Sequence, residues 1–433
     1  MSLRNENSVL KKVLIIAYYW PPAGGPGVQR WLKFVKYLPD FNVEPVVFVP
    51  EQATYPIVDK SLEAEVSNDL KVVNLPISEP YKFANFFSKR KTNSISKGLI
   101  SESKRQSILE KVMLFVRGNF FVPDARVGWV KPATQFLLDY ISKENIETII
   151  TTGPPHSMHL IGLNLKQKLN IKWLADFRDP WTTIGYHKQL KLTKWSQKKH
   201  KSLEKQVLTT ADQIIATSSI TKKEFQNITK QPISVITNGY DDEIFKRADL
   251  DEKFTIAHIG SFLSKRNPEI LWIALSELMR AYDDFKNDLQ LNLVGFVSND
   301  IIKSIENYNL TDYINKVGYV SHLESVKCQK KSQVLLLVEI DSEDTRCIIP
   351  GKLFEYMVSK RPIIAIGPEA SDVEQIIKNT NTGKYFNYQD FESLKKTILE
   401  HYQAFKKGDL GTNPIGLEKY HRKSLTKALS NLL

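Results

Sequence analysis

The chain has 433 residues, more than one hydrophobic core usually supports, and 42% hydrophobic with 25% charged residues is typical of a globular protein, so two domains are expected. Its two cysteines, Cys328 and Cys347, exclude a disulfide framework and favour a reducing compartment. The net charge of +12 favours anionic partners, which include nucleotides, phospholipid surfaces and nucleic acid.

The N-terminal residues Met1–Asn5 lack the apolar region of a signal peptide. Apolar runs such as Val13–Tyr18 and Val334–Val338 are too short to span a bilayer. We therefore expect a cytoplasmic protein, and the positive charge leaves peripheral association with the inner membrane face open as an option.

Short apolar runs rich in strand-forming residues alternate with longer amphipathic stretches, which is the pattern of parallel α/β folds. The strands predicted in the first half are Val13–Tyr18, Glu44–Val49, Lys71–Leu75, Glu147–Thr151, Lys172–Ala175, Gln213–Thr217 and Ser234–Thr237. Those predicted in the second half are Phe254–Ile259, Gln290–Val294, Lys316–Tyr319, Gln333–Val338 and Ile363–Ile366. Each set is long enough for a complete doubly wound sheet.

The polar, turn-rich segment Asn238–Glu243 follows a strand and precedes a new series of strands and helices, so it marks the joint between two domains. We expect an α/β protein with two Rossmann-like, doubly wound domains that face a cleft. The N-terminal domain is predicted to cover residues 1–240, and the C-terminal domain residues 241–417.

Two segments of the chain concentrate positive charge. Residues 82–117 contain nine lysines and arginines, two acids and many apolar residues, and residues 188–205 contain seven lysines, one acid and Trp195. Both segments can be solvated helix faces. Alternatively, they bind an anionic membrane surface, where each basic residue contributes about 1 kcal/mol. No compact recognition motif accompanies the charge, so nucleic acid is not expected as a partner.

The first predicted strand runs into the glycine-rich segment Trp20–Arg30, and helical periodicity begins at Trp31. Gly24 and Gly25 let a substrate approach the backbone, and a helix N-terminus favours an anion. Arg30 is expected to add a hydrogen-bond donor. It also stands where a dinucleotide-binding fingerprint needs its third glycine, which argues against a nicotinamide or flavin cofactor. A purely structural turn is the remaining alternative.

A second candidate site follows the predicted strand Gln333–Val338, where a polar loop leads to the helical pattern Pro350–Met357. Proline suits the first turn of a helix because its missing N–H is not needed there. Lys352 and Glu355 fall on the side opposite the apolar face of this helix. A lysine there can pair with phosphate, and a carboxylate can accept from ribose hydroxyls. Taken alone, an i,i+3 surface ion pair is the simpler interpretation.

Several ordered segments resemble the family 4 retaining glycosyltransferases, which have the two-Rossmann GT-B fold. Thr152–Ser157 and Asp176–Trp181 are similar to signatures of a branch that serves bacterial surface-polysaccharide assembly. The other segments resemble the first glycine-rich loop, the turn before the interdomain linker, and the donor-binding helix with its following strand: Pro21–Arg30, Asn238–Asp241, Pro350–Met357 and Arg361–Ile364. The resemblance extends over nearly the whole chain, and it implies that a C-terminal helix in residues 418–433 returns to the first domain.

The resemblance implies that a nucleotide-diphosphate sugar binds mainly to the C-terminal domain. Glu355 matches the carboxylate that binds ribose, and the backbone around Pro350, Gly351 and Lys352 matches the segment that meets the diphosphate. Val320 lies at the strand end whose backbone contacts the base.

The chain departs from the family pattern at two positions. Ser261 stands where many relatives have an arginine, so Arg266, with Lys265 beside it, is our candidate for the clamp on the diphosphate. Cys347 replaces a glutamate that touches the sugar hydroxyls in many relatives, and a thiol is a poor acceptor for a hydroxyl. The sugar is therefore left open, and a non-catalytic subunit that binds nucleotide or glycan is the alternative function.

His156 follows a predicted strand at a Gly-Pro-Pro turn, and we expect its imidazole to contact the donor sugar or the acceptor. Asp176 and Asp179 flank Arg178 at another strand end, where one of them orients the arginine or an acceptor hydroxyl. Of these two, Asp179 is the second catalytic candidate. The acceptor, a glycan or lipid-linked glycan, is expected on the first domain, with residues 82–117 as its platform.

Neither a cofactor nor a metal is expected for this reaction. No Cys/His cluster has zinc spacing, and a clamp of cations can neutralise the leaving diphosphate without a metal. The acidic pair in Glu339–Asp341, directly after a predicted strand, keeps a metal site as an alternative.

Overall fold

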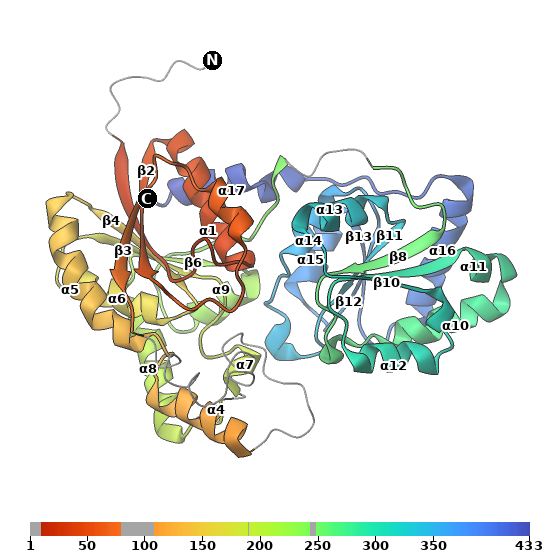
Figure 1. Ribbon diagram of the computed structural model, residues 1–433, viewed down its shortest axis with the longest axis horizontal. Helices are drawn as coiled ribbons and strands as arrows, with labels where there is room; N and C mark the ends of the chain where they lie inside the picture. Colours follow the sequence, from red (N-terminus) through yellow and green to blue (C-terminus); the bar gives the residue numbers. More distant parts are fainter. Residues whose placement is uncertain (1–9, 79–107, 189, 243–247) are drawn as a thin grey trace. The chain divides into compact units, whose positions relative to one another are not determined.

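The computed structural model describes residues 10–78, 108–188, 190–242 and 248–433 (Figure 1). Most of the predicted basic segment 82–117, up to residue 107, lies outside them. Contacts divide the chain into two units: unit 1 is Met1–Thr237 with Arg422–Leu433, and unit 2 is Asn238–His421. The sequence predicted these boundaries at residues 240 and 417.

Unit 1 contains a parallel sheet with the strand order β3-β2-β1-β4-β5-β6-β7. Its strands are β1 (Lys11–Ile16), β2 (Val43–Glu51), β3 (Lys71–Pro76), β4 (Thr148–Gly153), β5 (Lys172–Phe177), β6 (Gln213–Ala216) and β7 (Ile233–Val235). Its described helices are α1 (Pro26–Tyr37), α4 (Ile108–Phe120), α5 (Val127–Lys143), α6 (Ser157–Lys166), α7 (Gly185–Lys188), α8 (Lys194–Thr210), α9 (Ser219–Gln226) and α17 (Arg422–Ser430). The strand order reverses between β1 and β4, where such folds bind ligands.

Unit 2 repeats this topology with the order β10-β9-β8-β11-β12-β13. Its strands are β8 (Phe254–Ile259), β9 (Leu289–Val294), β10 (Ile314–Gly318), β11 (Val334–Val338), β12 (Ile363–Ile366) and β13 (Gly383–Phe386). Its described helices are α10 (Glu269–Ala281), α11 (Asp283–Asp288), α12 (Asn299–Asn307), α13 (His322–Lys331), α14 (Lys352–Val358), α15 (Asp372–Thr380) and α16 (Phe391–Lys407). Here the order reverses between β8 and β11. Both units are therefore doubly wound, as the sequence predicted.

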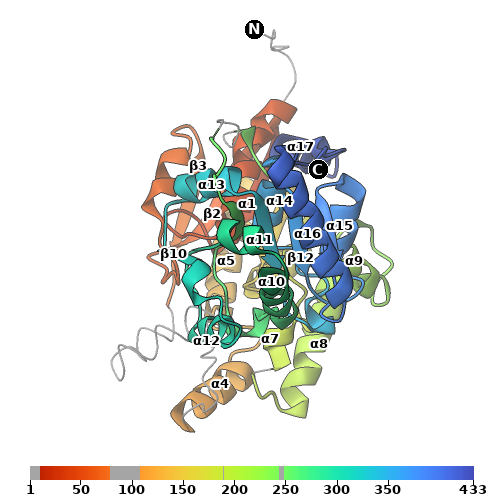
Figure 2. The same ribbon diagram turned by 90° about the vertical axis from the view of Figure 1, so that its right-hand side faces the viewer.

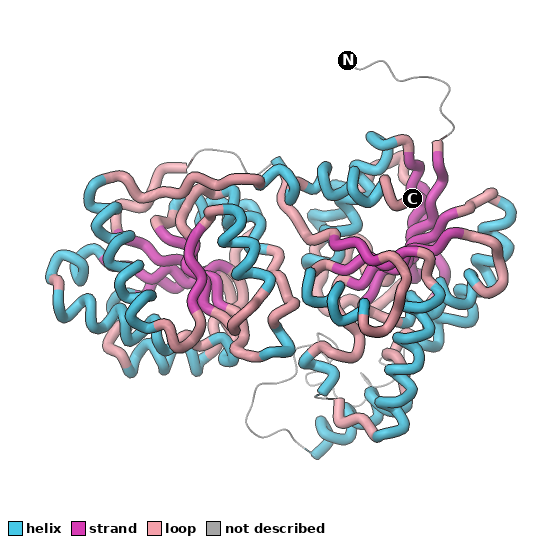
Figure 3. The backbone as a smooth tube through the Cα atoms, turned by 180° about the vertical axis from the view of Figure 1, so that it is seen from behind, coloured by secondary structure: helices cyan, strands magenta, loops and turns pink. Residues whose placement is uncertain are grey.

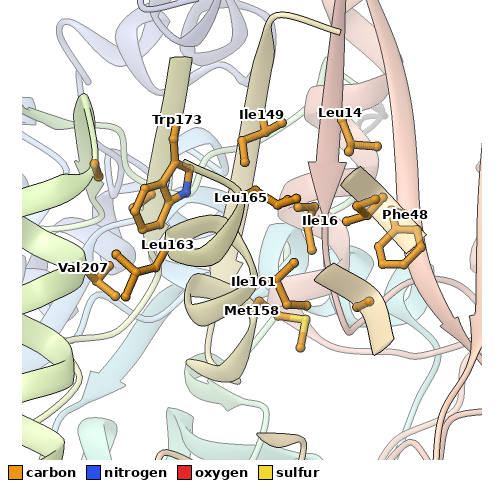
Figure 4. Packing of buried hydrophobic residues seen from close by; sticks show 14 of the residues in the cluster. Leu14, Ile16, Phe48, Ile149, Met158, Ile161, Leu163, Leu165, Trp173 and Val207 are labelled. Carbon is orange, nitrogen blue, oxygen red and sulfur yellow. The ribbon is translucent and has the colours of Figure 1, made fainter. Parts of the chain in front are cut away.

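Helices cover both faces of each sheet (Figure 3). In β1, Leu14 and Ile16 belong to the apolar cluster that includes Phe48 (Figure 4). Val13 and Ile15, which alternate with them, belong to a second cluster on the opposite face. Because successive side chains point to opposite faces, a strand covered on both sides is a continuous apolar run. This burial explains why the central strands could be recognised in the sequence.

The C-terminal helix α17 belongs to unit 1. Leu425 and Leu429 lie in the same core cluster as Trp31 of α1. Lys423 Nζ lies 2.6 Å from Asp40 Oδ2, which adds an ion pair at the surface of this contact. Residues at the end of the chain thus complete a core that is otherwise built near its beginning.

Two strands of unit 2, β10 and β13, differ most from the prediction, whereas β9 and β11 differ by one residue at their starts. β10 ends at Gly318, one residue before the predicted end, because this glycine has a φ of 76° and turns the chain. The edge strand β13 was not predicted. It has four residues and begins with Gly383, where a Cβ would lie 2.0 Å from the carbonyl oxygen of Ile363. Glycine is needed for this close pairing. Because glycine interrupts the apolar run, the strand is not recognised from its sequence.

Candidate functional site

Two glycine turns follow neighbouring strands at the carboxyl edge of the unit 2 sheet. Gly260 follows β8 and Gly295 follows β9, with φ angles of 107° and 108°. Gly260 N–H donates to Val294 O at 2.8 Å, and a Cβ on Gly295 would lie 2.7 Å from Gly260 O. The two turns therefore need glycine for both conformation and space. They leave the edge open to close approach by a ligand.

Lys352 lies at this edge, next to the point where the strand order reverses. Its Nζ donates to Ile259 O at 2.7 Å and lies 3.1 Å from His258 Nε2. A Cβ on Gly260 would lie 3.3 Å from the same atom. Among the described residues Lys352 forms no ion pair, although its side chain is partly buried. A cation in this position is available to an anionic ligand.

Burial sets the charge of both groups in this contact. It lowers the pKa of His258 well below its usual value, and the charges of Lys352 and Arg266 lower it further. The neutral imidazole can therefore accept from the lysine through Nε2. Burial, followed by the charge of Arg266, also lowers the pKa of Lys352 to about 7, while Glu355 opposes the shift. The lysine consequently gains or loses its proton near neutral pH.

Glu355 is held from two sides by α13. His322 Nε2 lies 2.9 Å from Glu355 Oε1, and Gln329 Nε2 donates to Glu355 Oε2 at 2.8 Å. Lys352 and Glu355 thus have different hydrogen-bond partners, one on β8 and the other on α13. The carboxylate is fixed in orientation before any ligand binds.

Arg266 lies in a short 3-10 helix, η4 (Ser264–Arg266), after β8. Its Nη1 donates to Ser261 O at 3.3 Å. Its charge lowers the pKa of both Lys352 and His258, so the guanidinium is near them. Arg266 and Lys352 form the basic part of this edge.

The remaining predicted residues of unit 2 flank this basic edge. Pro350 and Gly351 form the turn that starts α14, with Pro350 O accepting from Leu353 N–H at 3.0 Å. Val320, after β10, is partly buried against the core, whereas the preceding Tyr319 is 92% exposed. Both segments lie at strand or helix ends on the same side of the sheet.

Glu339, at the end of β11, is a buried carboxyl group with hydrogen-bond partners. It accepts from Tyr385 Oη at 2.8 Å and from Ser371 Oγ at 3.0 Å. Burial raises its pKa to about 8. Among the described residues, no group of three or more histidine, cysteine, aspartate or glutamate side chains could hold a metal ion. The two hydrogen bonds connect Glu339 to β13 and to the residue before α15.

The glycine-rich loop of unit 1 is organised by a neighbouring segment. Gly24 N–H donates to Ile57 O at 2.9 Å, and a Cβ on Gly24 would lie 3.0 Å from Ile57 Cγ2. Gly25 caps α1 with a φ of 102°. A pocket of about 610 Å3 with a mainly apolar lining lies beside this loop, and Trp20, Pro22 and Tyr55 are among its walls.

The expectation that Arg30 adds a donor to this loop is wrong. Arg30 is buried, and its Nη2 donates to Asp176 Oδ1 at 2.8 Å. Trp31 Nε1 and Thr152 Oγ1 each donate to Asp176 Oδ2 at 2.9 Å. The arginine points inward because the Asp176 carboxylate lies under the second turn of α1. Asp176 is thus a structural residue.

His156 lies at the carboxyl end of β4, at the start of α6. It is 5% exposed, and its ring stacks on Trp181 at 4.7 Å between centroids and an interplanar angle of 2°. Neither ring nitrogen has a hydrogen-bond partner among the residues that the structure describes. Burial, and next the neighbouring His159, lower its pKa well below the usual value. This neutral imidazole can donate to and accept from a ligand hydroxyl.

Arg178 and Asp179 follow β5. Arg178 Nη2 donates to Pro154 O, and a Cβ on Gly27 would overlap the guanidinium, so the arginine lies against the first turn of α1. Asp179 is half-buried, and burial raises its pKa while Arg178 opposes this. The carboxyl edge of unit 1 therefore brings together the loop at Gly25, His156 and Arg178.

Four residues that shape these edges were not predicted as site residues. Three of them, His258, His322 and Gln329, contact Lys352 or Glu355. The fourth, Arg178, was named in the sequence only as part of a motif. One feature of the sequence could have indicated His258: it is a single histidine in an otherwise apolar strand, and this strand ends directly before Gly260. No comparable signal marks Gln329.

Comparison with known proteins gives two findings. Residues 99–244 match the sequence profile of Glycosyltransferase Family 4. No curated protein matches the chain by sequence.

Solved structures share the fold over the whole chain. A sucrose-phosphate synthase from Thermosynechococcus elongatus is 15% identical, with a TM-score of 0.61 over 98% of each chain. The lipopolysaccharide outer core galactosyltransferase WaaB is 14% identical, with a TM-score of 0.59 over 97% of this chain and 98% of WaaB. TarM of S. aureus is 14% identical, with a TM-score of 0.56 over 98% of this chain and 99% of TarM.

At these identities the solved structures establish the fold, which is the GT-B fold of glycosyltransferases. The family match and the fold together support a transferase. Over residues 99–244 the match agrees with a family 4 glycosyltransferase, the family that the sequence motifs resemble.

Proposed function

We propose that the chain transfers a sugar from a nucleotide-diphosphate donor to a glycan or lipid-linked acceptor, with retention of configuration, in bacterial surface-polysaccharide biosynthesis at the cytoplasmic side. The observation that carries the proposal is Lys352, a partly buried cation at the carboxyl end of β8 in a doubly wound sheet. Nucleotides bind at this point of such sheets. A diphosphate would supply a negatively charged partner for this lysine.

In this proposal unit 2 binds the donor. Lys352 and Arg266 contact the diphosphate, and their charges stabilise the negative charge that develops on it as the bond to the sugar breaks. Glu355, fixed by His322 and Gln329, accepts from the ribose hydroxyls. The backbone at Val320 contacts the base, and the turn at Pro350 and Gly351 approaches the phosphates.

Unit 1 is proposed to bind the acceptor. The ring nitrogens of His156 supply a donor and an acceptor for sugar hydroxyls. The loop at Gly24 and Gly25 lets the substrate approach the backbone, and the apolar pocket beside it suits the less polar part of a lipid-linked glycan. Asp179 remains the second catalytic candidate. The leaving phosphate oxygen takes the acceptor proton, so no protein base is required.

Two solved relatives support this class of substrates. TarM was solved with UDP, and WaaB is described as a galactosyltransferase of the lipopolysaccharide outer core. Calorimetry with uridine and guanosine diphosphate sugars, followed by a donor-hydrolysis assay, tests the proposal. We expect one series to bind and to be hydrolysed, with retention visible by NMR of the product. Absence of binding by both series at millimolar concentration would contradict it, and binding without turnover would favour the non-catalytic alternative.

Donor affinity is expected to fall as the pH rises above about 7. Lys352, with its pKa lowered to about 7, loses its proton there in the free protein, whereas an adjacent diphosphate favours the charged form. The complex then holds more protons than the free protein, so binding weakens by up to about tenfold per pH unit. Calorimetry near pH 8 in buffers of different ionisation enthalpy measures the uptake of up to about one proton. An affinity that does not change with pH would refute the expectation.

His156→Ala is expected to lower kcat/KM by about fivefold, because one hydrogen bond to a neutral sugar hydroxyl contributes about 1 kcal/mol. His156→Phe is the matched control, since it keeps the stacking on Trp181 and removes the ring nitrogens. Both variants should lose activity in a steady-state transfer assay. Full activity of His156→Phe would mean that the ring acts through packing alone.

A further inference from the structure

Helix α4 of unit 1 has apolar side chains on two opposite faces. Leu114 is buried on the inner face, and Gly118 lies against Leu190 and Leu192, where a Cβ would approach them within 3 Å. The outer face carries side chains that are between 39% and 73% exposed: Val112, Phe115, Val116 and Phe120. A water-facing helix surface is normally polar, so an apolar outer face indicates a partner.

Helix α8 places a basic surface beside it. Its exposed lysines are Lys194, Lys198, Lys199, Lys201 and Lys205. The one acid of this helix, Glu204, is buried and accepts from Thr182 Oγ1 at 2.5 Å, so it does not offset the charge at the surface. Trp195 is 64% exposed, with Lys199 Nζ 5.0 Å from its ring centroid.

The two helices are joined at their ends, which places the outer face of α4 near the start of α8. Asn119 of α4 accepts from Thr193 N–H at 2.7 Å and donates to Lys191 O at 3.3 Å. Figures 1 and 2 show α4 and α8 next to each other at one end of unit 1. We call the outer face of α4 together with the exposed residues of α8 the α4–α8 surface.

We propose that the α4–α8 surface adsorbs to an anionic lipid bilayer, with Phe115, Phe120 and Trp195 at the level of the headgroups and the lysines against the lipid phosphates. Aromatic and aliphatic side chains flanked by lysines are what such an interface binds. A two-fold pairing of two chains through this surface would set the same lysines against each other, which disfavours it. Among the described residues no helix is long and apolar enough to cross a membrane.

Vesicle flotation of the full chain, without nucleotide sugar, tests this proposal independently of the proposed function. We expect flotation with vesicles of phosphatidylglycerol and phosphatidylcholine in equal parts, little with phosphatidylcholine alone, and a loss of binding at high salt. Two variants remove one element each: Phe115→Ser with Phe120→Ser, and glutamine at Lys194, Lys198, Lys199 and Lys201. The lysine variant removes four charges and should weaken binding by on the order of 1000-fold.

Matched controls change the same properties elsewhere. Glutamine at the exposed Lys303, Lys378, Lys396 and Lys407 of unit 2 gives the same net charge, and Leu250→Ser with Ile415→Ser removes exposed apolar side chains outside the surface. These controls should float like the native chain. Failure of the native chain to float at low salt overturns the proposal. So does an equal loss in the controls, or a concentration-dependent dimer that the phenylalanine variant abolishes without any flotation of the native chain.

Discussion

Lys352→Met is expected to weaken binding of the nucleotide-diphosphate sugar by roughly 100-fold, since a charge-assisted contact to phosphate contributes up to about 3 kcal/mol. Methionine keeps the apolar stem and removes the ammonium that lies 2.7 Å from Ile259 O. The loss should be visible in calorimetry as a raised Kd and in the transfer assay as a lower kcat/KM.

The same substitution separates binding from folding. Burial lowers the pKa of Lys352, which means that the folded state disfavours its charge, so removing that charge should not decrease the free energy of unfolding. Lys378→Met, at an exposed position on α15 of the same unit, is the control and should leave both binding and stability unchanged. Native affinity in Lys352→Met would show that the lysine does not contact the donor.

Asp176→Ala is expected to destabilise unit 1 by about 3–5 kcal/mol, which is the usual cost of removing one partner of a buried ion pair. Arg30 would keep its charge in a site where both side chains of the pair are at most 1% exposed. The donors of Trp31 and Thr152 would lose their acceptor as well. Urea denaturation followed by tryptophan fluorescence and circular dichroism measures the loss.

Asp139→Ala, an exposed position on α5 of the same unit, is the control for this measurement, and it should change stability by less than about 0.5 kcal/mol. Two units can unfold in separate transitions, so the two probes should be compared before a single free energy is fitted. A loss below about 1 kcal/mol in Asp176→Ala would contradict the structural role of the pair.

The strands of both units could be predicted because parallel strands covered on both faces leave continuous apolar runs in the sequence. β8 and β12 begin and end at the predicted residues, Phe254–Ile259 and Ile363–Ile366. β13 was not predicted because an edge strand needs no continuous apolar run. Its first residue is a glycine, which the close backbone contact requires. Burial of a strand on both faces produces a recognisable local sequence pattern. Close approach of two backbone segments produces none.

The residues of the candidate site could likewise be predicted only in part. Lys352 and Glu355 could be selected from the periodicity of one helix and from the family resemblance. Their hydrogen-bond partners could not be selected in this way, because His258, which contacts Lys352, lies 94 positions away in the sequence. The error at Arg30 has the same origin, since Asp176 lies 146 positions along the chain and nothing near Arg30 indicates a buried carboxylate. Periodicity predicts which way a side chain faces, and only the tertiary fold decides what it meets there.

The return of α17 to unit 1 fixes the order in which the protein can fold during synthesis. Unit 2 is one uninterrupted stretch of chain, Asn238–His421, and it can fold as soon as that stretch has left the ribosome. The hydrophobic core of unit 1 beside α1 stays incomplete until Leu425 and Leu429 have been synthesised. The first unit to be made is therefore the last to be finished, and a chain truncated before residue 422 would hold a folded unit 2 attached to an incomplete unit 1.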